Sequence, residues 1–146
     1  MGKFRRLIGP AAVMLLIFLF SQQSGEISHA ISDWCGDVLN YIFGGKLEYP
    51  DSSEPLFLGL SLRKYAHLAL YALLGAMTYR AVSGGHWQGR RVAWLLTLLV
   101  CFLYACVDEF HQFFVPGRAF HLRDIGIDMI GSVVGMMVSG MINREK

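Results

Sequence analysis

The chain is poor in charged residues. Only 16% of its 146 residues are Asp, Glu, Lys or Arg, whereas a soluble domain has about 25%. The charges are missing from four long apolar blocks and lie in the gaps between them. Lipid imposes this pattern, because each helix must satisfy its own backbone polar groups there. We therefore predict an all-α membrane protein of one domain over residues 1–146, with four transmembrane helices at about 7–22, 62–82, 92–114 and 125–142.

Other scarcities exclude further classes of protein. The chain has three cysteines, two of them inside an apolar block, which is no disulfide framework. Its net charge of +2 gives no electrostatic reason to expect nucleic acid as a partner. The sequence contains no G-x-S-x-G, no Walker loop and no H-E-x-x-H, so a serine hydrolase has little support.

The basic residues predict an orientation. The first apolar block follows Lys3, Arg5 and Arg6, and no small-x-small cleavage site precedes Ser21, so we expect a retained anchor and not a signal peptide. With the N-terminus inside, 8 of the 13 Lys and Arg residues lie on the cytoplasmic side and 5 outside. Ten of the 11 acidic residues then lie outside. The excess of basic residues inside favours an N-in, C-in topology.

The outer segment between the first two spans contains an amphipathic helix by its pattern. Its apolar residues recur at a spacing of three to four, at Ile27, Ile31, Trp34, Val38 and Ile42. Such an extracytoplasmic helix suits the lipid–water interface. Packing on the outer end of the bundle fits the same pattern equally well.

Polar residues gather where three of the predicted spans reach the outer boundary. They are Lys64 and His67 on the second span, Glu109 and Gln112 on the third, Arg118 in the turn that follows, and Asp124 and Asp128 on the fourth. A charge costs about 2.5–3.5 kcal/mol at the centre of a span, and less near its end. A structural ion pair needs only two groups, so this convergence favours a functional site. Arg63, Arg123, His111 and His121 are expected to have structural or lipid-facing roles.

Three chemistries fit this set of residues. Lys64, Arg118 and Gln112 fit an anion site, for example for the phosphate of a lipid. Glu109, His67 and Asp124 fit general acid–base catalysis. Asp124 and Asp128 fit a divalent cation such as magnesium or manganese that bridges to a phosphate. Zinc is favoured less, because no ligand spacing is diagnostic of it. Whether the protein is an enzyme stays open.

The same residues carry a family resemblance. The matching segments are Lys64-x-x-His67-x-x-x-Tyr71-x-x-x-Gly75, then Asp108-Glu109-Phe110-His111-Gln112 through Val115-Pro116-Gly117-Arg118, then Asp124-x-x-x-Asp128-x-x-Gly131-x-x-x-Gly135. With Ser21 to Gly25 at the end of the first span, they make the chain resemble the VanZ-like family of bacterial membrane proteins. Many members have Asn where this chain has Asp128. The resemblance implies the bacterial cytoplasmic membrane, the cell envelope and a link to glycopeptide (teicoplanin) resistance, but no agreed activity.

Three functions follow as hypotheses. In the first, the protein binds or processes an anionic lipid or lipid-linked envelope precursor at the outer leaflet. In the second, it is a non-enzymatic resistance or envelope-modifying factor. The third, a lipid transporter or scramblase, is favoured least, because the inner halves of the spans hold few ionisable residues. The oligomeric state is open too, since Gly131 and Gly135 fit either packing within the chain or dimerisation.

Overall fold

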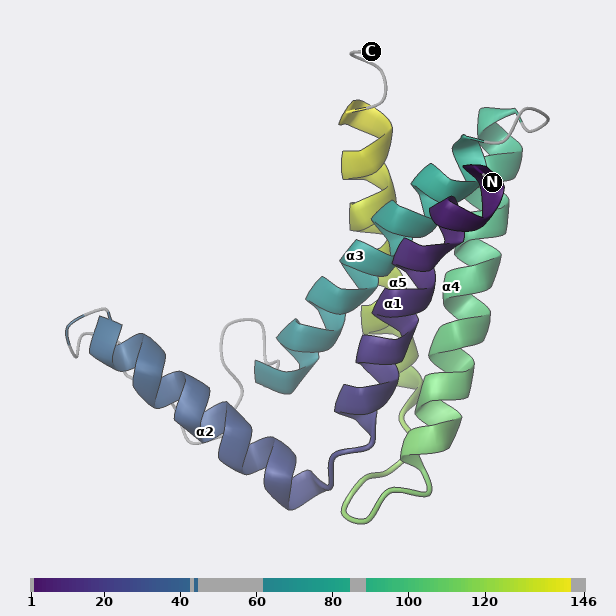
Figure 1. Ribbon diagram of the computed structural model, residues 1–146. Helices are drawn as coiled ribbons and strands as arrows, with labels where there is room; N and C mark the ends of the chain where they lie inside the picture. Colours follow the sequence, from purple (N-terminus) through teal and green to yellow (C-terminus); the bar gives the residue numbers. More distant parts are fainter. Residues whose placement is uncertain (1, 43, 45–61, 85–88, 143–146) are drawn as a thin grey trace.

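The protein folds into five α-helices (Figure 1), as seen in a computed structural model that describes residues 2–42, 44, 62–84 and 89–142. The helices are α1 (Gly2–Ser21), α2 (Gly25–Ile42), α3 (Leu62–Ser83), α4 (Arg90–Gln112) and α5 (Leu122–Ile142). No strand occurs in these described ranges, so the prediction of an all-α protein is confirmed.

Four of the helices coincide with the predicted apolar segments. α4 ends at Gln112 and not at residue 114, because the backbone N–H of Phe114 turns back to the carbonyl of His111. Among the described residues, α4 and α5 are long and apolar enough to cross a membrane. Two helices of this kind suggest a membrane protein.

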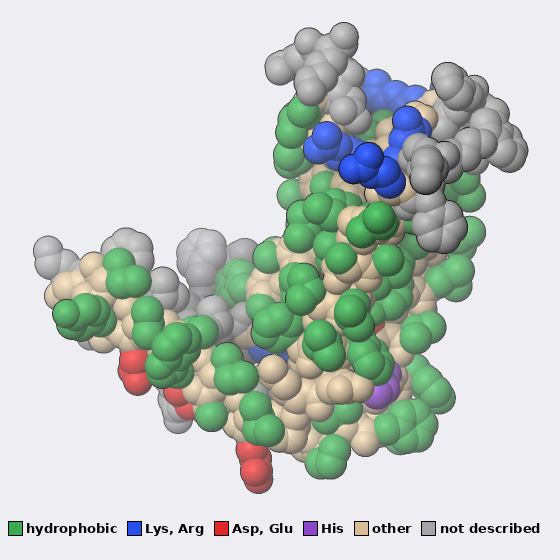
Figure 2. All heavy atoms as spheres, viewed as in Figure 1, with side chains coloured by type: hydrophobic (Ala, Val, Ile, Leu, Met, Phe, Trp, Pro, Cys, Tyr) green, Lys and Arg blue, Asp and Glu red, His purple; other side chains and the backbone are tan. Residues whose placement is uncertain are grey.

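The bundle is apolar on its outside and partly polar on its inside. Along α4, large apolar side chains are exposed at Leu95, Leu99, Leu103, Val107 and Phe110. The opposite face of the same helix buries Thr97, Cys101, Ala105, Asp108 and Gln112. Figure 2 shows hydrophobic side chains over much of the bundle. In water so large an exposed apolar surface would be a liability, and it marks contact with lipid or another partner.

α3 is the central helix, and its closest partner is α5. The two backbones nearly touch at the glycines of α5. A methyl group added to Gly135 would overlap the carbonyl oxygen of Ala72, and one added to Gly131 would overlap that of Leu68. The G-x-x-x-G pair therefore serves packing within the chain, which was one of the two alternatives.

α2 extends away from the bundle and makes few contacts with it (Figure 1). The predicted helix is confirmed here, and its apolar side chains are exposed, with Trp34 at 66% and Ile42 at 67% of full exposure. Acidic side chains lie along another side of α2 in Figure 2. Within the described residues, α2 touches the bundle only at α3, so packing on the bundle covers little of its apolar face.

Candidate functional site

A small pocket lies at the end of the bundle that is away from both chain termini. Its lining comes from three helices: Arg63, Lys64 and His67 of α3, Glu109 and Gln112 of α4, and Asp124, Ile127 and Asp128 of α5. The free volume of the pocket is about 10 Å³, close to the least that one water molecule needs. The pocket therefore has room for a water molecule or a single ion. A larger group would have to bind at its open side or displace side chains.

Lys64 and Asp124 form an ion pair in this pocket. The distance from Lys64 Nζ to Asp124 Oδ1 is 2.5 Å, and the two side chains are 25% and 15% exposed. Asp124 lies in the first turn of α5, where the N-terminal helix dipole also favours a negative charge. Lys64 thus already holds one anion, the carboxylate of Asp124.

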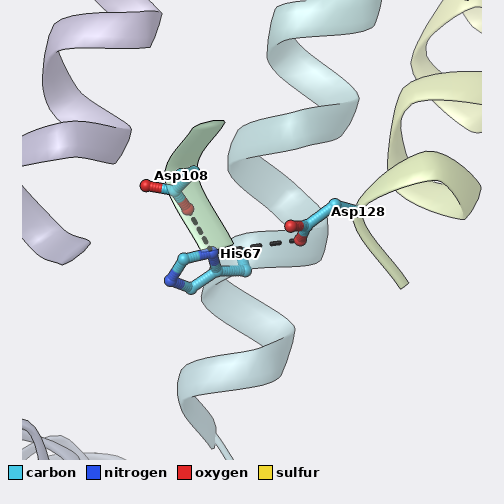
Figure 3. Close-up of side chains that lie close together, drawn as sticks. All are labelled: His67, Asp108 and Asp128. Carbon is cyan, nitrogen blue, oxygen red and sulfur yellow. Dashed lines mark ion pairs between the residues drawn. The ribbon is translucent and has the colours of Figure 1, made fainter. Parts of the chain in front are cut away.

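Deeper in the pocket, His67 lies between two carboxylates. Its Nδ1 atom is 3.9 Å from Asp108 Oδ2 and 3.9 Å from Asp128 Oδ1 (Figure 3). All three side chains are at most 10% exposed. The side chains of this inner group are thus less exposed than that of Lys64. The ammonium group of Lys64 therefore lies nearer the surface than His67 and the two aspartates.

Gln112 ties the inner group to α1. Its Nε2 atom donates to Asp108 Oδ2 at 3.0 Å and to Ser21 Oγ at 3.3 Å. Gln112 and Asp108 are four residues apart, so they share one face of α4. Because Ser21 is the last residue of α1, these bonds fix the end of α1 against α4 beside the pocket.

Glu109 holds the connection between α4 and α5. Its Oε1 atom accepts a hydrogen bond from the backbone N–H of His121 at 2.7 Å, and the residue is 1% exposed. One carboxylate oxygen of Glu109 is therefore committed to the backbone that leads into α5. This bond sets the position of Asp124, three residues further on.

The turn between α4 and α5 places Arg118. Pro116 and Gly117 occupy its centre, Gly117 has a φ of 76°, and the N–H of Arg118 donates to the carbonyl of Val115. This is the arrangement of a type II turn, which needs glycine at the third position. Arg118 Nη2 donates to the carbonyl of Phe20 at 3.3 Å, so the turn also holds the end of α1.

The guanidinium of Arg118 keeps unused donors. Among the described atoms, its Nε and Nη1 have no hydrogen-bond partner although both are buried. Burial and the neighbouring positive charge of Arg63 lower the pKa of Arg118 to about 10. A guanidinium normally stays charged, so these donors remain available for an anion that reaches them.

The structure brings most of the predicted site residues together. Lys64, His67, Glu109, Gln112, Asp124 and Asp128 all line the pocket, and Arg118 is not among its lining residues. Two further residues belong to the site. Arg63, expected to face lipid, lines the pocket, and Asp108 reaches the inner group from beside Glu109. Asp108 continues the buried stripe of Cys101, Ala105 and Gln112, and that spacing was the signal in the sequence.

The comparison with family models gives a match over residues 7–143, to the family described as VanZ/LLP1. The chain belongs to the VanZ/LLP1 family. Searches of curated proteins and of solved structures gave no match. Membership in the VanZ/LLP1 family fits a resistance-associated protein of the cell envelope, and the resemblance noted in the sequence is confirmed.

Within the VanZ/LLP1 match, the three motif segments meet at one end of the bundle. The Lys64 and His67 segment, the Asp108 to Gln112 segment and the Asp124 and Asp128 segment each supply residues to the pocket or to its inner group. The motif also contains Gly75, Gly131 and Gly135, which lie at the close contact of α3 with α5. The motif thus combines the pocket with the packing that brings its helices together.

Proposed function

We propose that this VanZ/LLP1 protein binds a phosphate-bearing headgroup, of an anionic lipid or a lipid-linked envelope precursor, at the pocket end of its bundle. One observation carries the proposal: Lys64 is the most exposed charged group of the pocket ion pairs, and Arg63 lines the pocket beside it. A phosphate arriving from the membrane surface would meet these cations first. Arginine and lysine are the usual protein partners of phosphate.

The unused donors of Arg118 support the same proposal. Its Nε and Nη1 atoms lack partners among the described atoms, and a buried donor without a partner is costly. Arg63 acts on Arg118 electrostatically, so the two guanidinium groups lie in one positive region. That region adjoins the pocket and extends the surface on which a phosphate would be held.

The proposal includes a membrane arrangement. α1, α3, α4 and α5 would each cross the bilayer, with both termini in the cytoplasm and α2 lying at the outer lipid–water interface. Support comes from Figure 2, where the blue Lys and Arg side chains cluster at the end of the bundle that carries both termini (Figure 1). The apolar exterior and the exposed apolar side chains of α2 also fit.

Thiol labelling tests this orientation with the protein's own Cys35 in α2. In a variant with Cys101→Ala and Cys106→Ala, a membrane-impermeant maleimide should label Cys35 in intact cells. In a matched variant that also carries Cys35→Ala and Gly89→Cys, which adds a thiol at an exposed site with open space around it, labelling should require permeabilised cells. The reverse pattern would show that the pocket faces the cytoplasm.

Chemistry on the bound headgroup is a further step of the same proposal. His67 or Glu109 would act as the base, and Asp124 would orient it or hold a cation together with Asp128. His67 suits proton transfer by its place in the pocket. Glu109 also lines the pocket, with one oxygen bonded to the backbone N–H of His121, and it would be the base if His67 holds a metal ion.

Binding of a polyprenyl phosphate to the protein in nanodiscs tests the headgroup proposal. Wild-type protein should bind it in preference to the unphosphorylated polyprenol. Lys64→Ala should weaken binding about tenfold, which corresponds to about 1.4 kcal/mol. The control Arg80→Ala also removes one positive charge from α3, but in the last turn of that helix. It should leave the affinity unchanged.

The other two functions make different predictions in the same system. Equal affinity of wild type and Lys64→Ala would contradict headgroup binding at the pocket. If resistance in cells persists in Lys64→Ala and His67→Ala at normal membrane levels, the non-enzymatic factor is favoured. If labelled lipid crosses the bilayer faster with the protein than without it, the scramblase is favoured.

A further inference from the structure

The inner group of the pocket joins three side chains from three helices. His67 of α3, Asp108 of α4 and Asp128 of α5 each offer one ligand atom, and these atoms lie within 4.8 Å of one another. Figure 3 shows His67 between the two carboxylates. The side chains of Asp108 and Asp128 are 1% and 4% exposed. Two carboxylates buried side by side repel each other unless a positive charge offsets them.

Hydrogen bonding accounts for only part of this group: Gln112 Nε2 donates to Asp108 Oδ2, but no hydrogen bond joins His67 to either carboxylate. His67 Nδ1 is 3.9 Å from each carboxylate oxygen, which is beyond the 3.2 Å or so of an N–H···O bond. A single N–H could also serve only one of the two oxygens. In addition, the fully buried hydroxyl of Tyr71 and the Oδ1 atom of Asp108 have no hydrogen-bond partner among the described atoms.

A shared ion accounts for the distances. Bonds from zinc to histidine nitrogen and carboxylate oxygen are about 2.0–2.2 Å long, so two ligands of one ion lie at most about 4.3 Å apart, and about 3.3 Å in a tetrahedral site. The two distances from His67 Nδ1, 3.9 Å each, fall between these limits. The three ligand atoms together spread over up to 4.8 Å, so the two carboxylates would have to rotate toward each other by about half an ångström to share one ion. We infer that His67, Asp108 and Asp128 bind one divalent transition-metal ion.

The donor set indicates the class of metal. One imidazole nitrogen with two carboxylate oxygens suits zinc or manganese, whereas magnesium and calcium prefer oxygen donors alone. Three protein ligands leave at least one position of the ion open, as in catalytic metal sites. The free volume of the pocket accommodates one ion or one water molecule, so a further ligand would reach the ion from the open side of the pocket.

The ion would also change the net charge that a phosphate meets at the pocket. With the inner group and the adjoining turn included, three permanent cations lie near four carboxylates: Arg63, Lys64 and Arg118 against Asp108, Glu109, Asp124 and Asp128. Three positive and four negative charges leave one negative charge, which would repel a phosphate, and a divalent ion would change it to one positive charge. This link to phosphate rests on the proposed headgroup binding. Binding of the ion itself does not, because the three ligands are complete without lipid.

Metal binding is tested with the full chain, purified, reconstituted in nanodiscs of neutral lipid and stripped with a chelator. Zinc and manganese are then added separately, and the retained metal is measured by mass spectrometry and calorimetry. Wild type should retain one equivalent per chain of at least one of the two metals and melt at a higher temperature with that metal. His67→Ala, Asp108→Asn and Asp128→Asn should each weaken binding by more than the roughly 10- to 100-fold that loss of an outer-shell partner costs.

Two controls match these changes outside the inner group. His121→Ala removes an exposed histidine at the same end of the bundle, and Asp37→Asn removes an exposed acid of α2. Both should retain the metal with unchanged affinity. If a ligand variant fails to fold, the wild-type protein is loaded with Co²⁺ and its visible absorption spectrum is recorded. The spectrum should show Co²⁺ coordinated by nitrogen and oxygen. A spectrum without such coordination would count against the site.

Other outcomes would overturn the inference. Wild type that retains neither zinc nor manganese has no such site. If Asp124→Asn abolishes retention while Asp108→Asn preserves it, the ion lies between Asp124 and Asp128 and the ligand set is different. If the wild-type protein binds polyprenyl phosphate but no metal, only the metal site is contradicted. If it binds metal but no polyprenyl phosphate, only the headgroup proposal is contradicted.

Discussion

Gly135→Ala should destabilise the protein, whereas Gly126→Ala in the same helix should not. The two changes add the same methyl group to α5. At residue 135 the methyl group would overlap the carbonyl oxygen of Ala72 on α3, and overpacking of this kind costs about 1–3 kcal/mol. At residue 126 nothing lies within 4 Å of the added atom, and alanine in a helix interior gains up to about 1 kcal/mol over glycine.

The stability comparison is made on purified protein in detergent, by thermal unfolding followed by size-exclusion chromatography. We expect the midpoint of Gly135→Ala to fall clearly below wild type and that of Gly126→Ala to equal or exceed it. Separation of α3 from α5 would also disturb the pocket, because α3 carries Lys64 and His67 while α5 carries Asp124 and Asp128. Equal midpoints for the two variants would mean that α3 and α5 do not pack this closely.

Asp124→Asn should tighten the binding of a phosphate headgroup, in the opposite direction to Lys64→Ala. The Asp124 carboxylate now holds Lys64 at 2.5 Å, so an arriving phosphate must compete with it. Asparagine keeps the shape and removes the competing charge. The pair is partly exposed, at 25% and 15%, so we expect a gain of about three- to tenfold and no more.

The double variant makes the Asp124 prediction specific. If Asp124 acts on the headgroup only through Lys64, then Lys64→Ala with Asp124→Asn should bind as weakly as Lys64→Ala alone. The measurement is a titration of polyprenyl phosphate into nanodiscs at fixed ionic strength, because charge pairs are screened by salt. Weaker binding by Asp124→Asn would instead assign Asp124 a direct role in the site, as a base or as a cation ligand.

The sequence predicts the helices and the end of the bundle that carries the site. The four apolar blocks and the spacing of Ile27, Ile31 and Trp34 are local properties, and the structure has helices in all five places. The convergence of polar residues is predictable too, because consecutive spans run antiparallel. The end of one span and the start of the next therefore lie at the same depth. The cost of charge in lipid then selects those residues without any knowledge of the packing.

The partners within the site depend on helix rotation, which the sequence does not fix. Asp108 and Glu109 differ by about 100° around α4. The structure turns Asp108 toward His67 and Glu109 toward the backbone of His121. Arg63 lines the pocket because of the rotation of α3. The rotation of α3 follows from the glycine contacts with α5, and that of α4 follows from the packing of its buried face, Thr97, Cys101, Ala105 and Asp108; only the folded chain reveals both.

A photocrosslinking experiment tests the central claim, that the pocket end holds a phosphate-bearing headgroup. A diazirine amino acid replaces Ile127, which lines the pocket and is 8% exposed, or Ile130 on the same helix, which is 60% exposed. After illumination of bacterial cells that make the protein, mass spectrometry identifies the attached lipids. At residue 127 the adducts should be strongly enriched in anionic lipids or lipid-linked phosphate precursors relative to their share of the bulk phospholipid, and at residue 130 they should match the bulk composition. The same bulk composition at both positions would contradict the account.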